Sequence, residues 1–181
     1  MLGQLLGVDP SRVEFDRTCP RCGAKHGKPR IIWPESPLDF SISVSADRAL
    51  LGVSQNTRVG VDLEYQSPQF DVSALARQWL TAPERSIMSA LPAKDRKTWV
   101  LQTWTRKEAT LKALGTGLLK DPRLLAVSRW DRDSLRVEWA HAETEAPVFV
   151  RDLEFAGYSA AVAGVALEGL HSDQTVITRL P

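Results

Sequence analysis

Apolar and polar residues follow a period of two along the segment 40–66, FSISVSADRALLGVSQNTRVGVDLEYQ. Its runs of apolar and β-branched residues are broken at 46–48 and 55–57, as is typical of strands joined by turns. We therefore expect a three-stranded antiparallel meander with strands at about 39–45, 49–54 and 58–64.

Beyond residue 68 the apolar positions recur with the period of a helix, and we expect three helices in succession. The first spans about 72–80, and the second follows the N-cap sequence TAPE at 81–84 and runs to residue 90. The third spans about 95–112, and a Gly-Thr-Gly sequence at 115–117 marks its end.

Both ends of the chain show further elements. Residues 1–7 predict the end of a helix, and 31–33 predict a strand within an ordered loop. The last third returns to strand patterns at about 124–130, 134–139, 148–155 and 158–167. Strands, then helices, then strands indicate the α+β class, with helices packed on antiparallel sheet.

A faint internal similarity joins the segments 40–54 and 153–165, which both read as two strands around a tight break. Either a duplication has produced two similar halves, or the likeness comes from the residue preferences that all hairpins share.

Composition limits the function further. The chain has 23 basic and 22 acidic residues and a formal net charge of +1, which gives no broad field for nucleic acid or for a membrane surface. No run of eighteen apolar residues is present, and the start MLGQLLGVDPSRVEF lacks the features of a signal peptide. We therefore expect a cytoplasmic protein.

Both cysteines lie in one CPRC unit, Cys19 and Cys22, followed closely by His26. A structural zinc ion requires four ligands, and the remaining histidines, His141 and His171, are far along the chain. The sequence therefore favours a plain turn with buried thiols over a zinc site.

Two carboxylates, Asp62 and Glu64, lie two residues apart in the strand sequence GVDLE. Side chains at this spacing point to the same face of a strand, whereas Val61 and Leu63 point to the core. A divalent cation would relieve the repulsion between the acids, and oxygen ligands suit Mg²⁺. The alternative is a strand end whose acids are solvated.

The helix sequence WTRKEATLKALGTGL at 104–118 carries Lys107, Glu108 and Lys112. Glu108 and Lys112 are four residues apart, which is the spacing of an ion pair on a solvated helix face. Alternatively, Glu108 supplies a third carboxylate to a metal ion, and the lysines bind phosphate oxygens.

The loop sequence HGKPR at 26–30 can present Lys28 and Arg30 to an anionic ligand, with Ser43 and Ser45 in the strand that follows. A solvated loop would have the same pattern.

Taken in order, the segments HGKP, FSISVS, GVDLE, WLTAPER and WTRKEATLKALGTGL closely resemble the Sfp-type 4′-phosphopantetheinyl transferases, over roughly 19–166. The pair GVDxE and W-x-x-KE-x-x-x-K is the most specific part of this resemblance. The shorter holo-acyl-carrier-protein synthase type shares GxD and KEAxxKAxGTG, but its chains build their site between subunits. The later position of Asp62 in this chain favours the Sfp type and a monomer.

The resemblance implies a fold of two similar α+β halves that form a pseudo-dimer, with coenzyme A and Mg²⁺ in the cleft between them. The halves would be 1–64 and 65–181, the first being short at its N-terminus. The implied reaction is the transfer of phosphopantetheine from coenzyme A to a serine of an acyl or peptidyl carrier protein, which leaves 3′,5′-ADP. The carrier could belong to polyketide, nonribosomal peptide or fatty acid synthesis.

Carried over by motif, the resemblance gives each candidate residue a role. Asp62, Glu64 and Glu108 would hold the metal ion, and Glu108 would also take the proton of the carrier serine. Coenzyme A would be bound by a set of polar residues: Lys28, Arg30, Ser43, Lys107 and Lys112. A carrier would dock on 66–80 if Phe70 and Trp79 are surface anchors, although both residues also suit the core.

One position departs from the family pattern. Val44 stands where the family usually has a histidine that reaches the 3′-phosphate, so we expect weaker coenzyme A binding unless a residue such as Arg48 compensates. Two other functions remain open: a coenzyme A or carrier-binding module without turnover, and a small zinc-dependent regulator built on the CPRC unit.

Overall fold

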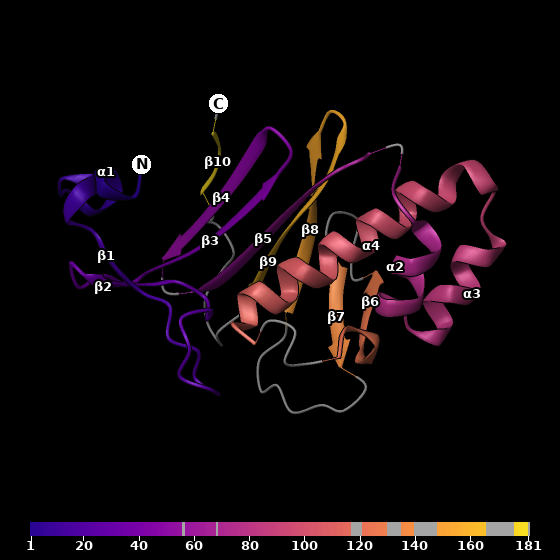
Figure 1. Ribbon diagram of the computed structural model, residues 1–181, viewed down its shortest axis with the longest axis horizontal. Coiled ribbons are helices and arrows are strands. Elements are labelled where there is room, and N and C mark those ends of the chain that lie inside the picture. Colours follow the sequence, from indigo (N-terminus) through magenta and orange to yellow (C-terminus); the bar gives the residue numbers. More distant parts are fainter. Residues whose placement is uncertain are drawn as a thin grey trace.

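The computed structural model describes residues 1–55, 57–67, 69–116, 121–129, 135–139, 148–165 and 176–180. Within these ranges the chain forms antiparallel sheets that pack with one long helix, as Figure 1 shows. A few predicted positions lie outside the described residues: Gly117, Trp130, Ser134 and 166–167.

The strands have the following bounds: β1 Glu14–Asp16, β2 Arg30–Trp33, β3 Leu38–Ser45, β4 Arg48–Gln55, β5 Arg58–Tyr65, β6 Leu125–Arg129, β7 Leu135–Trp139, β8 Val148–Phe155, β9 Tyr158–Val165 and β10 Val176–Leu180. The α-helices are α1 Leu2–Leu6, α2 Val72–Trp79, α3 Ala82–Ala90 and α4 Ala93–Leu114, and two 3₁₀ turns are η1 Pro10–Arg12 and η3 Pro122–Leu124. The predicted α+β class is confirmed.

The three helices predicted after residue 68 are all present, because their end signals are specific. Thr81 and Glu84 form a capping box at the start of α3, with each side chain bonded to the backbone of the other residue. Gly115 ends α4 in the left-handed conformation with φ 70°. The third helix begins at Ala93, slightly before the predicted start near Asp95.

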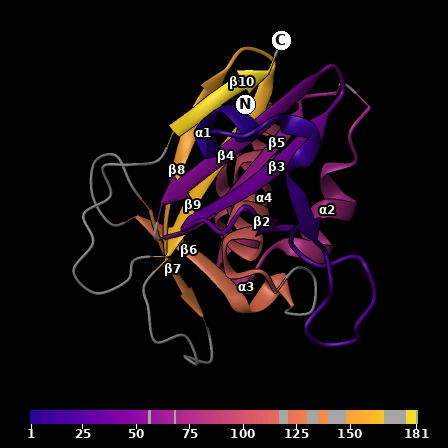
Figure 2. The ribbon, with the colours of Figure 1, turned by 90° about the vertical axis from the view of Figure 1, so that its left-hand side faces the viewer.

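The predicted three-stranded meander is wrong in its pairing, although its three strands exist. β3 and β4 form a hairpin, but the other edge of β4 pairs with β10, as Figure 2 shows. In this pairing Ala49 lies opposite Leu180. β5 leaves this sheet and pairs with β9 along its whole length. The larger sheet has the order β5-β9-β8-β7-β6. The meander failed because the local pattern could not show that β10 takes the free edge of β4.

Polar side chains of β3 join the two sheets by bonding to the backbone of β5. Asp39 Oδ2 accepts a hydrogen bond from Val59 N at 2.7 Å, and Ser41 Oγ accepts one from Val61 N at 3.1 Å. Ser45 Oγ accepts a third from Tyr65 N, at 3.0 Å. Each bond spans 20 residues, so β3 and β5 run parallel. We call these contacts the side-chain ladder.

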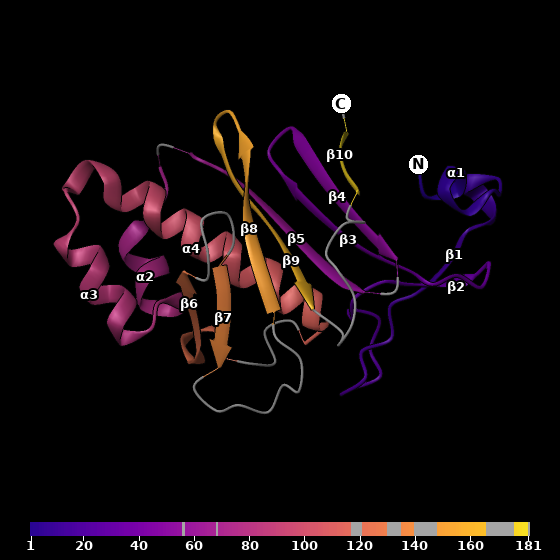
Figure 3. The ribbon, with the colours of Figure 1, turned by 180° about the vertical axis from the view of Figure 1, so that it is seen from behind.

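The helix α4 packs closely on β5 and β9. In Figure 3 these two strands lie in front of the helix. A Cβ atom at Gly60 would lie 1.9 Å from the carbonyl oxygen of Ala109 and 2.3 Å from the amide nitrogen of Ala113. Small buried residues of β9, Ala161 and Ala163, belong to the same cluster as these alanines. This close contact places the polar residues of α4 beside those of β5.

The proposed carrier anchors belong to the core instead. Trp79 is 8% exposed, and its ring centroid lies 6.0 Å from that of Trp104. Phe70 stacks on the same indole at 5.8 Å. These contacts favour the core interpretation of Phe70 and Trp79.

We predict that Gly60→Ala strongly destabilises the protein, because the new methyl group would overlap the α4 backbone. Overpacking of this kind costs about 3 kcal/mol or more where the backbone must shift. The matched control is Gly164→Ala in β9, where an added Cβ meets no atom within 4 Å. Urea unfolding of both variants measures the difference, and equal free energies of unfolding would contradict the close helix–strand contact.

Candidate functional site

Asp62 lies at the centre of a polar cluster between β5 and α4, where it is only 2% exposed. Its Oδ1 atom accepts hydrogen bonds from Lys112 Nζ at 2.7 Å and from Ser43 Oγ at 2.9 Å. Lys112 Nζ also donates to Ser43 Oγ at 3.0 Å. Three elements, β3, β5 and α4, therefore meet at one carboxylate.

The second oxygen of the same carboxylate has no partner. Asp62 Oδ2 is buried and makes no hydrogen bond within the described part of the chain. A carboxylate oxygen that is buried without a partner costs free energy, so a ligand that coordinates this atom would remove that cost.

Two further carboxylates lie near Asp62. Burial and the charge of Asp62 raise the pKa of Glu64 to about 7, although Ser45 Oγ donates a hydrogen bond to its Oε2 at 3.1 Å. Burial also raises the pKa of Glu108, with Asp62 adding to the shift and Lys112 opposing it. The repulsion among the three acids is what a bound cation would relieve.

These residues suit a hard divalent cation such as Mg²⁺, because their donors are carboxylate oxygens and one of these is unpartnered. However, the carboxylate oxygens of Asp62, Glu64 and Glu108 do not lie close enough together to hold one cation directly. In the described ranges, the only three His, Cys, Asp or Glu residues whose ligand atoms lie within 4.8 Å of one another are Cys19, Cys22 and His26. A cation among the acids would therefore need their side chains to converge, or water to complete its shell.

The residues predicted to bind coenzyme A do not all gather at this cluster. Lys28 is half-buried, pairs with Asp39 and donates to the carbonyl oxygen of Val59 at 2.8 Å. Burial lowers its pKa, with Asp39 opposing the shift and Arg58 adding to it. Arg30 is exposed and pairs with Asp16 at 3.0 Å, further out on the same loop region.

Successive side chains near the end of β3 point alternately to the cluster around Asp62 and to the solvent. Ser43 is buried and bonded to both Asp62 and Lys112, so its hydroxyl stabilises the cluster in this state. Val44, which follows it, is 68% exposed. A residue at position 44 can thus contact a ligand outside the cluster.

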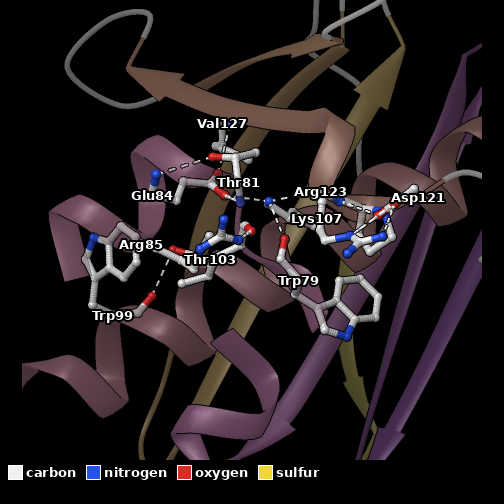
Figure 4. A network of polar contacts seen from close by, with 12 residues as sticks. Trp79, Thr81, Glu84, Arg85, Trp99, Thr103, Lys107, Asp121, Arg123 and Val127 are labelled. Atoms are coloured by element: carbon white, nitrogen blue, oxygen red, sulfur yellow. Dashed lines mark hydrogen bonds and ion pairs between the residues drawn. The ribbon is translucent and has the colours of Figure 1, made fainter. Parts of the chain in front are cut away.

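Lys107 lies in a separate network, and the structure does not bring it to Asp62. Its side chain is fully buried, and its Nζ donates to Glu84 Oε2 at 2.6 Å, Trp79 O at 2.6 Å and Pro122 O at 3.1 Å (Figure 4). All three ammonium protons are used by the protein. We therefore leave Lys107 out of the coenzyme A set, because no donor remains for a phosphate.

Sequence reasoning missed two acids that position the lysines. Asp39 pairs with Lys28. The alternation of polar residues at 39, 41, 43 and 45 could have indicated that Asp39 belongs to a polar face of the strand. Glu84 holds Lys107, but the motif TAPE indicated only its role as a capping residue.

Known proteins that resemble this chain share the segment that contains the cluster. A family model described as the 4′-phosphopantetheinyl transferase superfamily matches residues 58–163. The 4′-phosphopantetheinyl transferase HetI of Nostoc sp. is 36% identical over 122 residues, covering 66% of this chain and 49% of HetI. The 4′-phosphopantetheinyl transferase AcpT of Escherichia coli is 34% identical over 91 residues, covering 50% of this chain and 46% of AcpT. The chain thus spans about half the length of the curated relatives it matches.

Solved structures show the same fold. A holo-(acyl-carrier-protein) synthase from Bacillus anthracis, in complex with CoA (3′,5′-ADP), matches with a TM-score of 0.52 and 20% identity over 60% of this chain and 96% of that one. The holo-[acyl-carrier-protein] synthase of Neisseria meningitidis matches with a TM-score of 0.51 and 16% identity, over 60% and 97% of the two chains. In addition, no helix among the described residues is long and apolar enough to cross a membrane.

We predict that Lys107→Met destabilises the fold by about 3–5 kcal/mol, because Glu84 would keep a buried charge without its ion pair. The matched control is Lys94→Met, at an exposed position on the same helix. Chemical denaturation at pH 7 measures both variants. A loss below about 1 kcal/mol for Lys107→Met would contradict a buried ion pair.

Proposed function

The chain belongs to the 4′-phosphopantetheinyl transferase superfamily, and from that premise we propose that it modifies a carrier protein. It would transfer the 4′-phosphopantetheine group of coenzyme A to a serine hydroxyl of an acyl or peptidyl carrier protein. A bond forms between the serine oxygen and the phosphorus of the phosphopantetheine. The pyrophosphate bond to that phosphorus breaks, and 3′,5′-ADP leaves.

The observation that carries this proposal is the buried cluster around Asp62, with Lys112 bonded to it and Glu64 and Glu108 beside it. It lies within the segment that the family model matches. Phosphoryl transfer depends mainly on positioning and on neutralising charge, and this cluster offers acids and a cation from two rigid elements.

Glu108 is the residue that we assign as the base. Its pKa is raised by burial and by Asp62, so its carboxylate has more affinity for a proton than a solvated glutamate has. A base performs best when its pKa approaches the working pH. Glu108 would hold the serine proton directly or through a water molecule.

The cations would exchange partners when coenzyme A binds. Lys112 is bonded to Asp62 and Ser43, and it would turn from them toward the pyrophosphate. Lys28 would turn from Asp39 toward the 3′-phosphoadenosine end. Ser43, released from Lys112, could then donate to a phosphate oxygen, and the exposed Arg30 would add a cation at the rim of this site.

We propose that Asp62, Glu64 and Glu108 would hold Mg²⁺, which fits the unpartnered Asp62 Oδ2. The ion would neutralise the developing charge on the pyrophosphate. Replacement of the family histidine by Val44 removes one phosphate contact, and we expect weaker binding of coenzyme A as a result.

Mass spectrometry of an apo carrier protein tests the function. The carrier is incubated with this protein, coenzyme A and Mg²⁺, with EDTA in a parallel sample. A gain of one phosphopantetheine that EDTA abolishes would support the transferase. Bound coenzyme A without any gain, on carriers of several pathways, would favour a binding module instead.

We predict that Glu108→Gln lowers kcat by at least ~10², because it removes the base and a metal ligand while it keeps the side-chain shape. The matched control is Glu35→Gln, at an exposed position in the loop after β2. Steady-state assays with the carrier measure both variants. Equal turnover in the two would remove Glu108 from the site.

We also predict that Mg²⁺ affinity falls below pH 7, because the pKa of Glu64 is about 7 and a proton there competes with the metal ion. The loss should approach about tenfold per pH unit for one competing proton. Calorimetric titration with coenzyme A present, at pH 6 and pH 8, measures the effect. In Glu64→Gln the pH dependence should weaken, and an unchanged dependence would assign the proton to another group.

A further inference from the structure

The CPRC unit and the following histidine bring three metal-binding atoms together, away from the cluster around Asp62. The ligand atoms of Cys19, Cys22 and His26 lie within 4.8 Å of one another. Cys22 Sγ and His26 Nε2 are 3.0 Å apart, so the ring nitrogen already faces a sulfur atom. Cys19 is buried, whereas the other two residues are exposed.

The backbone between the cysteines forms a tight turn that is closed by its own hydrogen bonds. Gly23 adopts φ 73°, its N–H donates to the carbonyl oxygen of Cys19 at 2.9 Å, and the N–H of Cys19 donates to Ala24 O at 2.8 Å. The turn thus keeps both sulfur atoms within 4.8 Å of each other.

This arrangement differs from the plain turn with buried thiols that the sequence favours. One sulfur is exposed, and the histidine, four residues beyond Cys22, reaches back to it. Two thiolates and one imidazole are soft and borderline ligands, a set that selects zinc over Mg²⁺ or Ca²⁺. A closed structural site takes four protein ligands, but zinc sites of the open type seen in catalytic zinc proteins have three protein ligands and keep a water molecule in the fourth position.

We propose that Cys19, Cys22 and His26 bind one zinc ion, with water as the fourth ligand. The two thiolates balance the charge of the ion. The exposed side of the site leaves room for the water.

The zinc ion would fix the loop that carries Lys28. Gly27 follows the last ligand, and its N–H donates to Arg17 O at 2.7 Å. A Cβ at Gly27 would lie 2.9 Å from Thr18 O, so the two arms of the loop are in close contact there. A metal ion that ties Cys19 to His26 holds these arms together, and Lys28 comes immediately after them.

Metal content is the direct test, and it does not depend on the transferase activity. The reduced protein, purified without chelator, should contain one zinc per chain by elemental mass spectrometry. After the zinc is removed, titration with Co²⁺ should give the visible bands of a tetrahedral ion and a thiolate charge-transfer band in the near ultraviolet. No zinc and no Co²⁺ spectrum would overturn the proposal.

Variants locate the site. Cys22→Ser and His26→Gln each remove one exposed ligand, so both should fold and lose zinc affinity by at least ~100-fold. The matched control is His171→Gln, which changes a histidine far along the chain and should keep the zinc. Zinc retained equally in all three variants would place the metal elsewhere and overturn the proposal.

Proteolysis tests the effect on the loop. Trypsin should cut after the exposed residues Arg17, Arg21 and Lys25 several times faster once zinc is removed, and added zinc should restore protection. Equal cleavage rates with and without zinc would overturn the proposal that the zinc ion orders this loop. A Cys19–Cys22 disulfide in protein kept with zinc and without oxidant would show a redox pair instead of a metal site.

Discussion

Gly60 lies directly beneath α4, and the contact between them leaves no space for a side chain. Because the helix backbone comes this close to β5, Lys112 can reach the carboxylate that lies two residues along the strand from Gly60. The side-chain ladder from β3 then fixes the other edge of β5. Together these contacts hold Asp62 between three elements and remove it from water. Glu64 and Glu108 are themselves partly buried beside it, and their own burial together with the charge of Asp62 raises the pKa of both.

Two lysines on α4 show how burial separates similar residues. Lys107 and Lys112 are five positions apart, and both pair with an acid. Lys107 has used its three donors inside the protein, whereas Lys112 remains partly exposed beside an unpartnered carboxylate oxygen. A charge that is fully satisfied contributes to the fold, and a charge in an incompletely satisfied cluster is available for a ligand.

Local signals predicted the parts that depend on neighbours in the chain. The capping residues of α3, the glycine that ends α4 and the shared face of Asp62 and Glu64 could all be read from spacing. The pairing of β5 with β9 and of β4 with β10 could not be predicted from spacing, because long-range packing determines which strands become neighbours. For the same reason the burial of Lys107 was missed: its acid, Glu84, is 23 residues away on another helix.

The strand pairing also determines when the protein can fold during its synthesis. Ala49 pairs with Leu180 and Arg58 with Val165, so the sheet of β3 and β4 and the sheet of β5 each need a strand from near the end of this sequence. A ribosome therefore releases the β3–β4 hairpin long before β10, the strand that pairs with β4, has been synthesised. Non-local pairing of this kind folds more slowly than a helical bundle of equal size, and it leaves strand edges exposed until the last strands are made.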